Sequence, residues 1–201
     1  MVSQLTSAPP DLMTAEEFYD WAHLPENADG SHELEDGKIV QIMSRPNRTH
    51  GLICWIVSHW LGNYVIPRGG YLLTNDTGFI VKRRPDSVRG PDVMMFLKAD
   101  FRILDDIQPK YVENVPDLIV EVYSPTDRPG KLNKRIKEYL GKGVPLIWVI
   151  YPQDRTVAVF RLKSEFESLD EIDTLEGKNA PPDYKLPVAD LFRQPGTPTQ
   201  E

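Results

Sequence analysis

The chain has 201 residues, of which 40% are hydrophobic and 26% are charged, and a single cysteine. This length and composition predict one folded domain with a buried core and argue against disorder of the whole chain. Because one cysteine can form neither an internal disulfide nor a paired-cysteine zinc site, a disulfide-stapled secreted fold is excluded. We find no signal-peptide pattern and no apolar run long enough to cross a membrane, so we expect a soluble cytoplasmic protein.

The net charge of −7 is concentrated near the C-terminus. Residues 164–176 hold six acidic residues and no Lys or Arg, and without these six the net charge is −1. The acidity is therefore a local feature, and net charge alone does not exclude a DNA substrate.

Residues 12–192 are expected to form a single domain, with residues 1–11 and 193–201 as flexible tails. A capping box predicts a short helix over residues 14–23, and an Asp-Gly turn predicts a β-hairpin over residues 32–43. Apolar residues at helical spacing then predict a long helix over residues 49–66.

Strands and a second helix are expected in the rest of the domain. The strands are expected at residues 71–74, 78–82, 93–97, 118–123, 146–151 and 156–162. A helix over residues 131–141 joins the strand at 118–123 to the continuous apolar strand at 146–151. This βαβ crossover implies a parallel pair within a mixed sheet.

Glu121 is the most informative residue, because it interrupts an otherwise apolar strand. A charge in the middle of a buried strand is costly unless it is paired or bound to metal. Asp117 shares its face but lies roughly 13 Å away along the strand, so it is too far to share a cation. We expect Asp117 to make local hydrogen bonds and the partner acid to be Asp92, on a neighbouring strand. The alternative is that Glu121 pairs with a buried Arg or Lys.

Several ordered segments carry a resemblance to a known family. They are Met13–Phe18, His32–Gly37, Gly90–Val93, Val115–Pro125 and Glu138–Pro152. Together they resemble the Uma-type family of bacterial proteins in the PD-(D/E)XK restriction-endonuclease-like superfamily, over roughly residues 12–192. The resemblance implies an α/β fold with a mixed sheet flanked by helices, an additional N-terminal hairpin and additional C-terminal strands.

The resemblance also implies a metal-dependent phosphodiesterase centre with Glu33, Asp92, Glu121 and Arg135 as its catalytic residues. Asp92 and Glu121 would hold Mg²⁺ or Mn²⁺, with the Val122 carbonyl as a third ligand. Glu33 matches the N-terminal glutamate of the family. The alternative for Glu33 is a solvated acid in the hairpin.

The sequence departs from the superfamily pattern at the lysine. The position two residues after the second acid is Tyr123, and the family resemblance implies a lysine on the following helix, where this chain has Arg135. The helical period places Arg135 beside the core-facing side and Lys134 toward solvent. An arginine neutralises phosphate charge but cannot deprotonate to act as a base.

Other chemically active residues have weaker signals. The basic stretch 82–84 with Arg89 is expected to be a solvated loop, with phosphate contact as the alternative. His50 is either local structure or a recurrent histidine of the family, and His59 is expected in the core. Cys54 has no base partner visible in the sequence and is expected to be inert.

Two functions follow. The first is a Mg²⁺-dependent DNA endonuclease, which by analogy of fold acts as a homodimer because a duplex has two strands to cut. The second is a catalytically inactive nuclease-fold module that binds DNA or a protein partner, which Tyr123 and Arg135 in place of lysines favour. A sugar hydrolase with two carboxylates has weaker support. For a metal site, the Asp92 and Glu121 carboxylates should lie within about 3–6 Å of each other.

Overall fold

The architecture is known from a computed structural model that describes residues 12–28, 32–42, 46–98, 111–124, 129–164, 166–178, 180–193 and 196. The helices are α1 (Ala15–Ala22), α2 (Arg48–Val65), the 3₁₀ helix η1 (Ile66–Arg68), α3 (Pro129–Lys142) and α4 (Val188–Leu191). The strands of the N-terminal half are β1 (His32–Glu35), β2 (Lys38–Gln41), β3 (Tyr71–Thr74), β4 (Phe79–Lys82), β5 (Ser87–Arg89) and β6 (Val93–Phe96). Those that follow are β7 (Leu118–Val122), β8 (Leu146–Tyr151), β9 (Thr156–Arg161), β10 (Glu167–Leu169), β11 (Thr174–Glu176) and β12 (Lys185–Pro187).

A six-stranded mixed sheet with the order β10-β9-β8-β7-β6-β3 forms the centre of the molecule. Strands β7 and β8 are parallel, as the βαβ crossover predicts, and the other neighbours in this sheet are antiparallel. Every residue of β7 and all but the last residue of β8 are buried. Apart from Glu121, these buried residues are apolar, as expected for strands whose two faces are both covered by helices.

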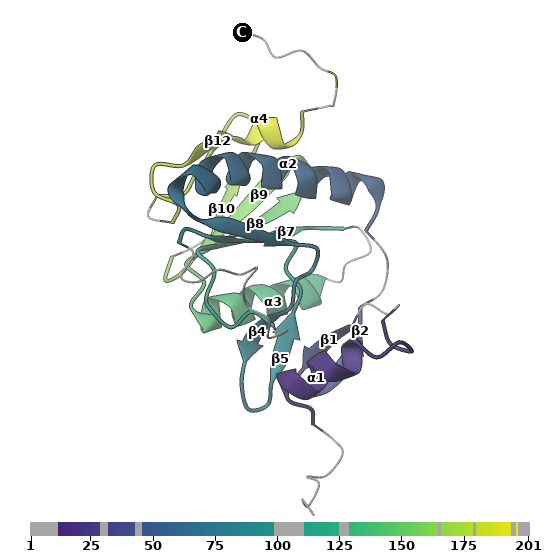
Figure 1. The fold of residues 1–201 in the computed structure, drawn as a ribbon. Helices are drawn as coiled ribbons and strands as arrows, with labels where there is room; N and C mark the ends of the chain where they lie inside the picture. The colour runs from purple at the N-terminus through teal and green to yellow at the C-terminus, as the bar shows by residue number, and fades with distance from the viewer. Residues whose placement is uncertain are drawn as a thin grey trace, which may run out of the picture.

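Figure 1 shows these layers: α2 and α4 cover one face of the central sheet, and α3 covers the other. Successive residues of β8 serve the two faces alternately. Trp148 packs in the cluster that includes residues of α2 and α4, whereas Ile147 packs with Tyr139 of α3.

A second sheet of four strands, in the order β2-β1-β5-β4, lies beside α3 and α1 (Figure 1). Its hairpin turns at Asp36 and Gly37, which have φ angles of 49° and 77°. Positive φ at both turn positions is what the Asp-Gly pair predicts. The sequence did not predict β5, because a three-residue strand ending in an arginine resembles a basic loop.

The expected helices agree with the structure to within a few residues. Asn47 caps α2 by accepting a hydrogen bond from the His50 amide at 2.9 Å. The domain limits of 12–192 stay a prediction, and nearly all of the two expected tails lies outside the described residues. No helix in the described part of the chain combines the length and the apolar character needed to span a bilayer.

Candidate active site

Asp92 and Glu121 come from neighbouring strands of the central sheet. Asp92 immediately precedes β6, which pairs with β7 so that Val93 lies opposite Val120. Oδ2 of Asp92 accepts a hydrogen bond of 2.6 Å from the Val122 amide, directly after Glu121. Asp92 and Glu121 thus lie on adjacent strands, and their shared role as metal ligands stays a prediction.

Both carboxyl groups hold their protons more tightly than usual. Burial raises the pKa of Asp92 well above its ordinary value, and the negative charge of Glu121 raises it further. Burial likewise raises the pKa of Glu121 to about 7, although Arg135 and a hydrogen bond from Tyr139 oppose this shift. Near neutral pH this pair therefore favours a bound proton or an added cation.

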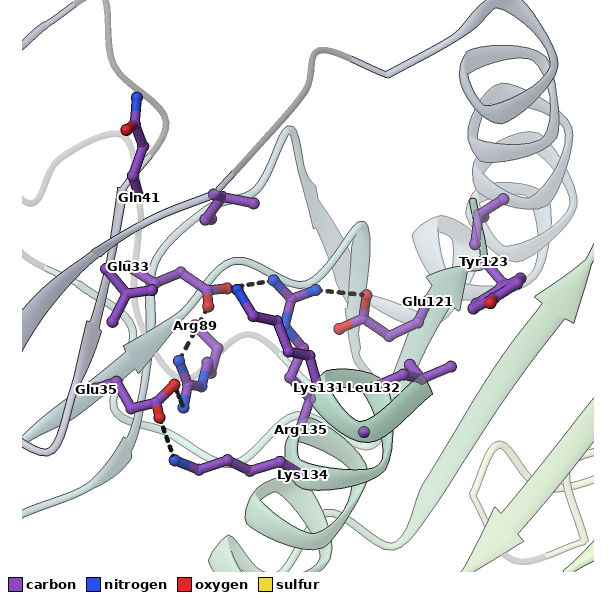
Figure 2. Close-up of a pocket in the computed structure, with 14 residues that line it drawn as sticks. Glu33, Glu35, Gln41, Arg89, Glu121, Tyr123, Lys131, Leu132, Lys134 and Arg135 are labelled. Atoms are coloured by element: carbon purple, nitrogen blue, oxygen red, sulfur yellow. Dashed lines mark hydrogen bonds and ion pairs between the residues drawn. The ribbon is translucent and has the colours of Figure 1, made fainter. Parts of the chain in front are cut away.

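Arg135 on α3 lies between two of the candidate acids (Figure 2). Its Nη2 atom is 2.8 Å from Oε1 of Glu33, and its Nη1 atom is 3.7 Å from Oε2 of Glu121. One turn further along α3, the Tyr139 hydroxyl donates to Oε1 of Glu121 at 2.6 Å. The helical period therefore gave the direction of Arg135 correctly. The ion pair between Arg135 and Glu121 also shows that Glu121 pairs with a basic residue, which was the alternative to a metal site.

Glu33 on β1 is buried, with 5% of its surface exposed, so the alternative of a solvated hairpin acid is wrong. Its carboxylate accepts hydrogen bonds from Arg89, from the Gly90 amide and from Arg135. It is therefore an internal ion-pair partner that holds Arg135.

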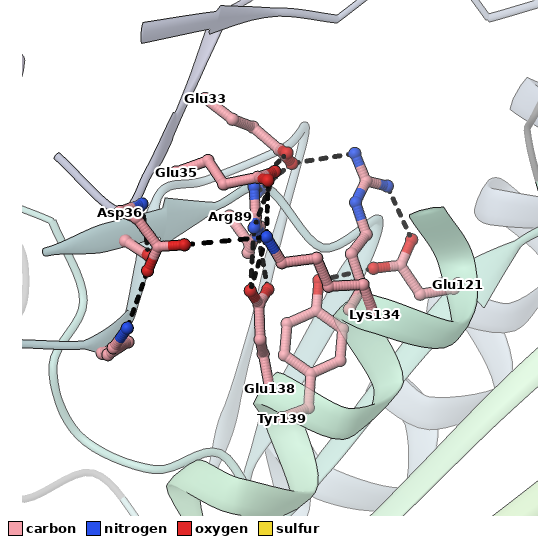
Figure 3. A network of polar contacts seen from close by, with 12 residues as sticks. Glu33, Glu35, Asp36, Arg89, Glu121, Lys134, Glu138 and Tyr139 are labelled. Carbon is pink, nitrogen blue, oxygen red and sulfur yellow. Dashed lines mark hydrogen bonds and ion pairs between the residues drawn. The ribbon is translucent and has the colours of Figure 1, made fainter. Parts of the chain in front are cut away.

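Arg89 is the centre of this network (Figure 3). Its side chain is 2% exposed and contacts Glu33 at 3.0 Å, Glu35 at 3.2 Å and Glu138 at 2.7 Å. The expectation that Arg89 belongs to a solvated loop is wrong, because it ends β5 and faces inward between the small sheet and α3.

Lys134 differs from its expected placement in part. Its Nζ atom lies 2.5 Å from Oε1 of Glu35, and its side chain is 41% exposed rather than fully solvated. The helical period places it away from the core of the central sheet, but the β1–β2 hairpin covers that side of α3. The helical period of α3 alone cannot predict this contact, because it contains no information on the second sheet.

A cavity of about 410 Å³ lies between the β1–β2 hairpin and α3 (Figure 2). The polar and charged residues lining it are Glu33, Glu35, Gln41, Arg89, Glu121, Tyr123, Lys131, Lys134 and Arg135, and Val122 lines it as well. The wall of this cavity therefore carries both acidic and basic side chains, many of them paired with one another.

His50 is the site residue whose position sequence reasoning left open. It lies in the first turn of α2, and its Nε2 atom is 3.0 Å from Oδ1 of Asp92. Asp76, in the β3–β4 turn, was missed entirely, and its negative charge raises the pKa of both Asp92 and Glu121. Family resemblance was the available signal for His50, whereas an Asn-Asp turn carries no signal for Asp76.

Comparison with known proteins shows the family of this chain. The profile of the family described as "Uma2: Putative restriction endonuclease" matches residues 15–189. The chain belongs to this family.

A solved structure from Anabaena variabilis ATCC 29413, described as "a putative nuclease belonging to DUF820", is similar to this Uma2 chain with a TM-score of 0.72. The two are 25% identical, and the match covers 90% of this chain and 97% of that one. No curated protein matches. The fold is therefore the restriction-endonuclease-like mixed α/β fold, and the family is nuclease-like.

The other residues singled out in the sequence of this Uma2 protein lie away from the cavity, and one of them differs from its predicted placement. Arg83 of the basic stretch pairs with three acids, namely Glu16, Asp86 and Glu113. Asp117 accepts a hydrogen bond from the Leu97 amide at 2.8 Å, as expected of a strand-start acid. His59 was expected in the core and is instead exposed, 3.0 Å from Asn63. Its position on α2 follows the apolar spacing, but that part of the helix surface faces outward.

Proposed function

We propose that this Uma2-family protein is a Mg²⁺- or Mn²⁺-dependent DNA endonuclease that hydrolyses phosphodiester bonds. The observation that carries the proposal is the position of Asp92 and Glu121 on adjacent strands, with Arg135 3.7 Å from Glu121 and these last two residues lining a cavity of about 410 Å³. Acids from two strands with a cation at their side are what metal-assisted cleavage of an anionic substrate requires.

The residues present fit a hard divalent cation. Asp92 and Glu121 offer carboxylate oxygens, and we assign the Val122 carbonyl as the third ligand; Mg²⁺ and Mn²⁺ prefer such oxygen donors. Burial is the main cause of the raised pKa of both acids, and neighbouring carboxylates raise these pKa values further; a bound dication would stabilise the ionised carboxylates. When bound, the ion supplies a water of lowered pKa and stabilises charge on the phosphodiester.

The other residues of the site position these groups. The Tyr139 hydroxyl fixes Oε1 of Glu121, and the Val122 amide fixes Oδ2 of Asp92. Glu33 holds the guanidinium of Arg135, which neutralises phosphoryl charge in this proposal. Arg135 cannot serve as a general base because its guanidinium stays protonated.

Plasmid cleavage tests the proposal. With Mg²⁺ or Mn²⁺ present, Asp92→Asn and Glu121→Gln should each reduce cleavage at least about a thousandfold, since losing a ligand removes about 4 kcal/mol of transition-state stabilisation. Glu167→Gln is the matched control, because Glu167 is an exposed acid on β10 that pairs with Lys178. Equal cleavage by all three variants would refute the assignment.

Arg135→Lys separates the nuclease from the inactive binding module. The absence of a lysine at both Tyr123 and Arg135 is the observation that favours the second function. If the site is active, Arg135→Lys should preserve or raise cleavage. If neither wild type nor Arg135→Lys cuts DNA but both bind it, the protein is the inactive binding module. A salt slope near −0.9 per contacted phosphate would then identify backbone neutralisation.

The proposal includes a homodimer, since a one-domain enzyme needs two sites to cut both strands of a duplex. Sedimentation equilibrium of the full chain should give twice the 23.0 kDa mass. A monomer that only nicks plasmid would limit the activity to one strand.

A further inference from the structure

A second group of metal-ligating side chains lies on the α2 side of Asp92. His50 and Cys54 are four residues apart on α2, so their side chains share one face of the helix. Nε2 of His50 lies 3.0 Å from Oδ1 of Asp92, and Sγ of Cys54 lies 3.8 Å from Nε2 of His50. One ligand atom from each of the three residues lies within 4.8 Å of the others.

Two of these separations are close to those in a tetrahedral metal site. Zinc bonds of about 2.0–2.3 Å place neighbouring ligand atoms about 3.3–3.6 Å apart. The nitrogen–oxygen and sulfur–nitrogen distances of 3.0 Å and 3.8 Å bracket this range. Because Sγ is also 3.9 Å from Nδ1 of the same ring, closing the site requires a rotation of Cys54 about its Cα–Cβ bond.

The donor set differs from that of the Mg²⁺ site. An imidazole nitrogen and a thiolate sulfur with one carboxylate select zinc and similar d-block ions, whereas magnesium prefers oxygen donors. Burial and the negative charges of Asp92, Asp76 and Glu121 raise the pKa of the Cys54 thiol. The same negative potential attracts a dication, which can replace the thiol proton and release it to solvent.

We propose that His50, Cys54 and Asp92 bind Zn²⁺ or a similar d-block dication, leaving one coordination position for water. Three protein ligands with one open position is the arrangement of catalytic rather than purely structural zinc sites. The site shares Asp92 with the proposed nuclease centre, so the two ions compete for this carboxylate. Metal binding itself requires no cleavage activity, so the inference goes beyond the proposed function.

Cobalt substitution tests the site directly. The reduced, metal-free full chain is titrated with Co²⁺, and we expect saturable visible bands of four-coordinate cobalt together with a near-ultraviolet thiolate-to-cobalt band. Because Cys54 is the only cysteine of the chain, this band can arise from no other residue. Zn²⁺ should bleach all the bands, and they should vanish in denaturant. A titration without the thiolate band would overturn the proposal.

Matched variants identify the other ligands. Cys54→Ser, which is close to isosteric, should lose the thiolate band while circular dichroism shows an unchanged fold. His50→Asn and Asp92→Asn should each weaken Co²⁺ binding. His59→Asn is the control, because His59 is an exposed histidine on the same helix, and its spectrum should match wild type. Wild-type spectra from His50→Asn and Asp92→Asn would also overturn the proposal.

Glu121→Gln separates this inference from the proposed function. It should abolish Mg²⁺-dependent cleavage and keep the thiolate-to-cobalt band, since Glu121 is not a ligand of the zinc site. If wild type shows the thiolate-to-cobalt band but does not cleave DNA, the zinc site is supported and the nuclease proposal is refuted. If wild type cleaves DNA but shows no such band, the nuclease proposal is supported and the zinc site is refuted. If both hold, Zn²⁺ should inhibit Mg²⁺-dependent cleavage, and Cys54→Ser should relieve that inhibition.

Discussion

Glu121 titrates in the range where proteins are normally assayed. Burial raises its pKa from 4.5 to about 7, so the folded metal-free protein retains a proton that the unfolded chain releases at lower pH. The stability contributed by this proton is fully present below pH 4.5 and is lost as pH rises through 7. A divalent ion needs the ionised carboxylate, so its affinity changes in the opposite direction.

We therefore expect Mn²⁺ to bind about tenfold more tightly at pH 8 than at pH 6, the change in the ionised fraction of a group with a pKa near 7. Isothermal titration calorimetry in matched buffers measures this difference. Glu121→Gln should reduce this pH dependence along with most of the affinity, and the buried Asp92 carboxyl, whose pKa is also raised, should account for what remains. Equal wild-type affinities at the two pH values would contradict the assignment of Glu121 as a ligand.

Lys134 and Arg135 are adjacent cations with unequal structural roles. Lys134→Ala removes a half-exposed pair with Glu35 and should lower the free energy of unfolding by less than about 1 kcal/mol. Arg135→Ala leaves Glu33 and Glu121 buried with one cation fewer and should cost about 3 kcal/mol. Urea denaturation at pH 8 compares the two variants. If Lys134→Ala lowers the free energy of unfolding more than Arg135→Ala does, the buried ion pairs of Arg135 are not the stronger ones.

Some of the candidate site residues could be predicted from the sequence, and others could not. Glu121 was identified because a charge inside an apolar strand needs an explanation, and Arg135 because helical geometry fixes its direction. His50 and Asp76 contact or influence Asp92 across long sequence separations. Nothing in the period of α2 or the composition of the β3–β4 turn specifies that approach, since it depends on how the helix and the sheet pack.

At the scale of elements, Arg89 joins the small sheet to α3. It ends β5, and it contacts two acids of β1 and one of α3. Arg89→Met leaves three carboxylates around an uncharged side chain, and the expected loss in the free energy of unfolding is about 3–5 kcal/mol. Urea denaturation measures the loss.

Arg83→Met is the matched control. Arg83 also contacts three acids, but its side chain is 33% exposed and water can replace the guanidinium, so the expected loss is about 1 kcal/mol or less. Similar losses for the two variants would show that burial does not distinguish these networks.

The elements could be predicted where the local pattern determines them. The helix α2, the buried strand β8 and the parallel pairing of β7 with β8 follow from apolar spacing and the length of the crossover. The separate four-stranded sheet could not be predicted, because it depends on β5. That strand is too short for a periodic signal, and its pairing partners β1 and β4 are fixed only by the tertiary fold.

At the scale of the whole molecule, the two sheets differ in how they are held. Strand β8 is central and buried, whereas β2 is an exposed edge with one partner, β1. We expect amides of β8 to exchange with deuterium only through global unfolding, and those of β2 to exchange through local opening of lower free energy.

Hydrogen exchange followed by mass spectrometry measures this hierarchy. In Arg89→Met, peptides of the β1–β2 hairpin should gain exchange more than those of β8, because the ion network holds the hairpin against α3. A uniform gain in both peptides would show that the molecule opens as a single unit.

The network around Arg135 draws on parts of the chain that are made at different times. During synthesis, Glu33, Asp92 and Glu121 emerge before Arg135, and β8 emerges later still and pairs with β7. A ribosome-bound chain that ends before residue 135 therefore carries the acids but neither the helix that forms the cavity wall nor the strand that completes the sheet. Premature termination products and proteolytic fragments of this kind therefore carry the acids without the Arg135 guanidinium that pairs with them and without the complete central sheet.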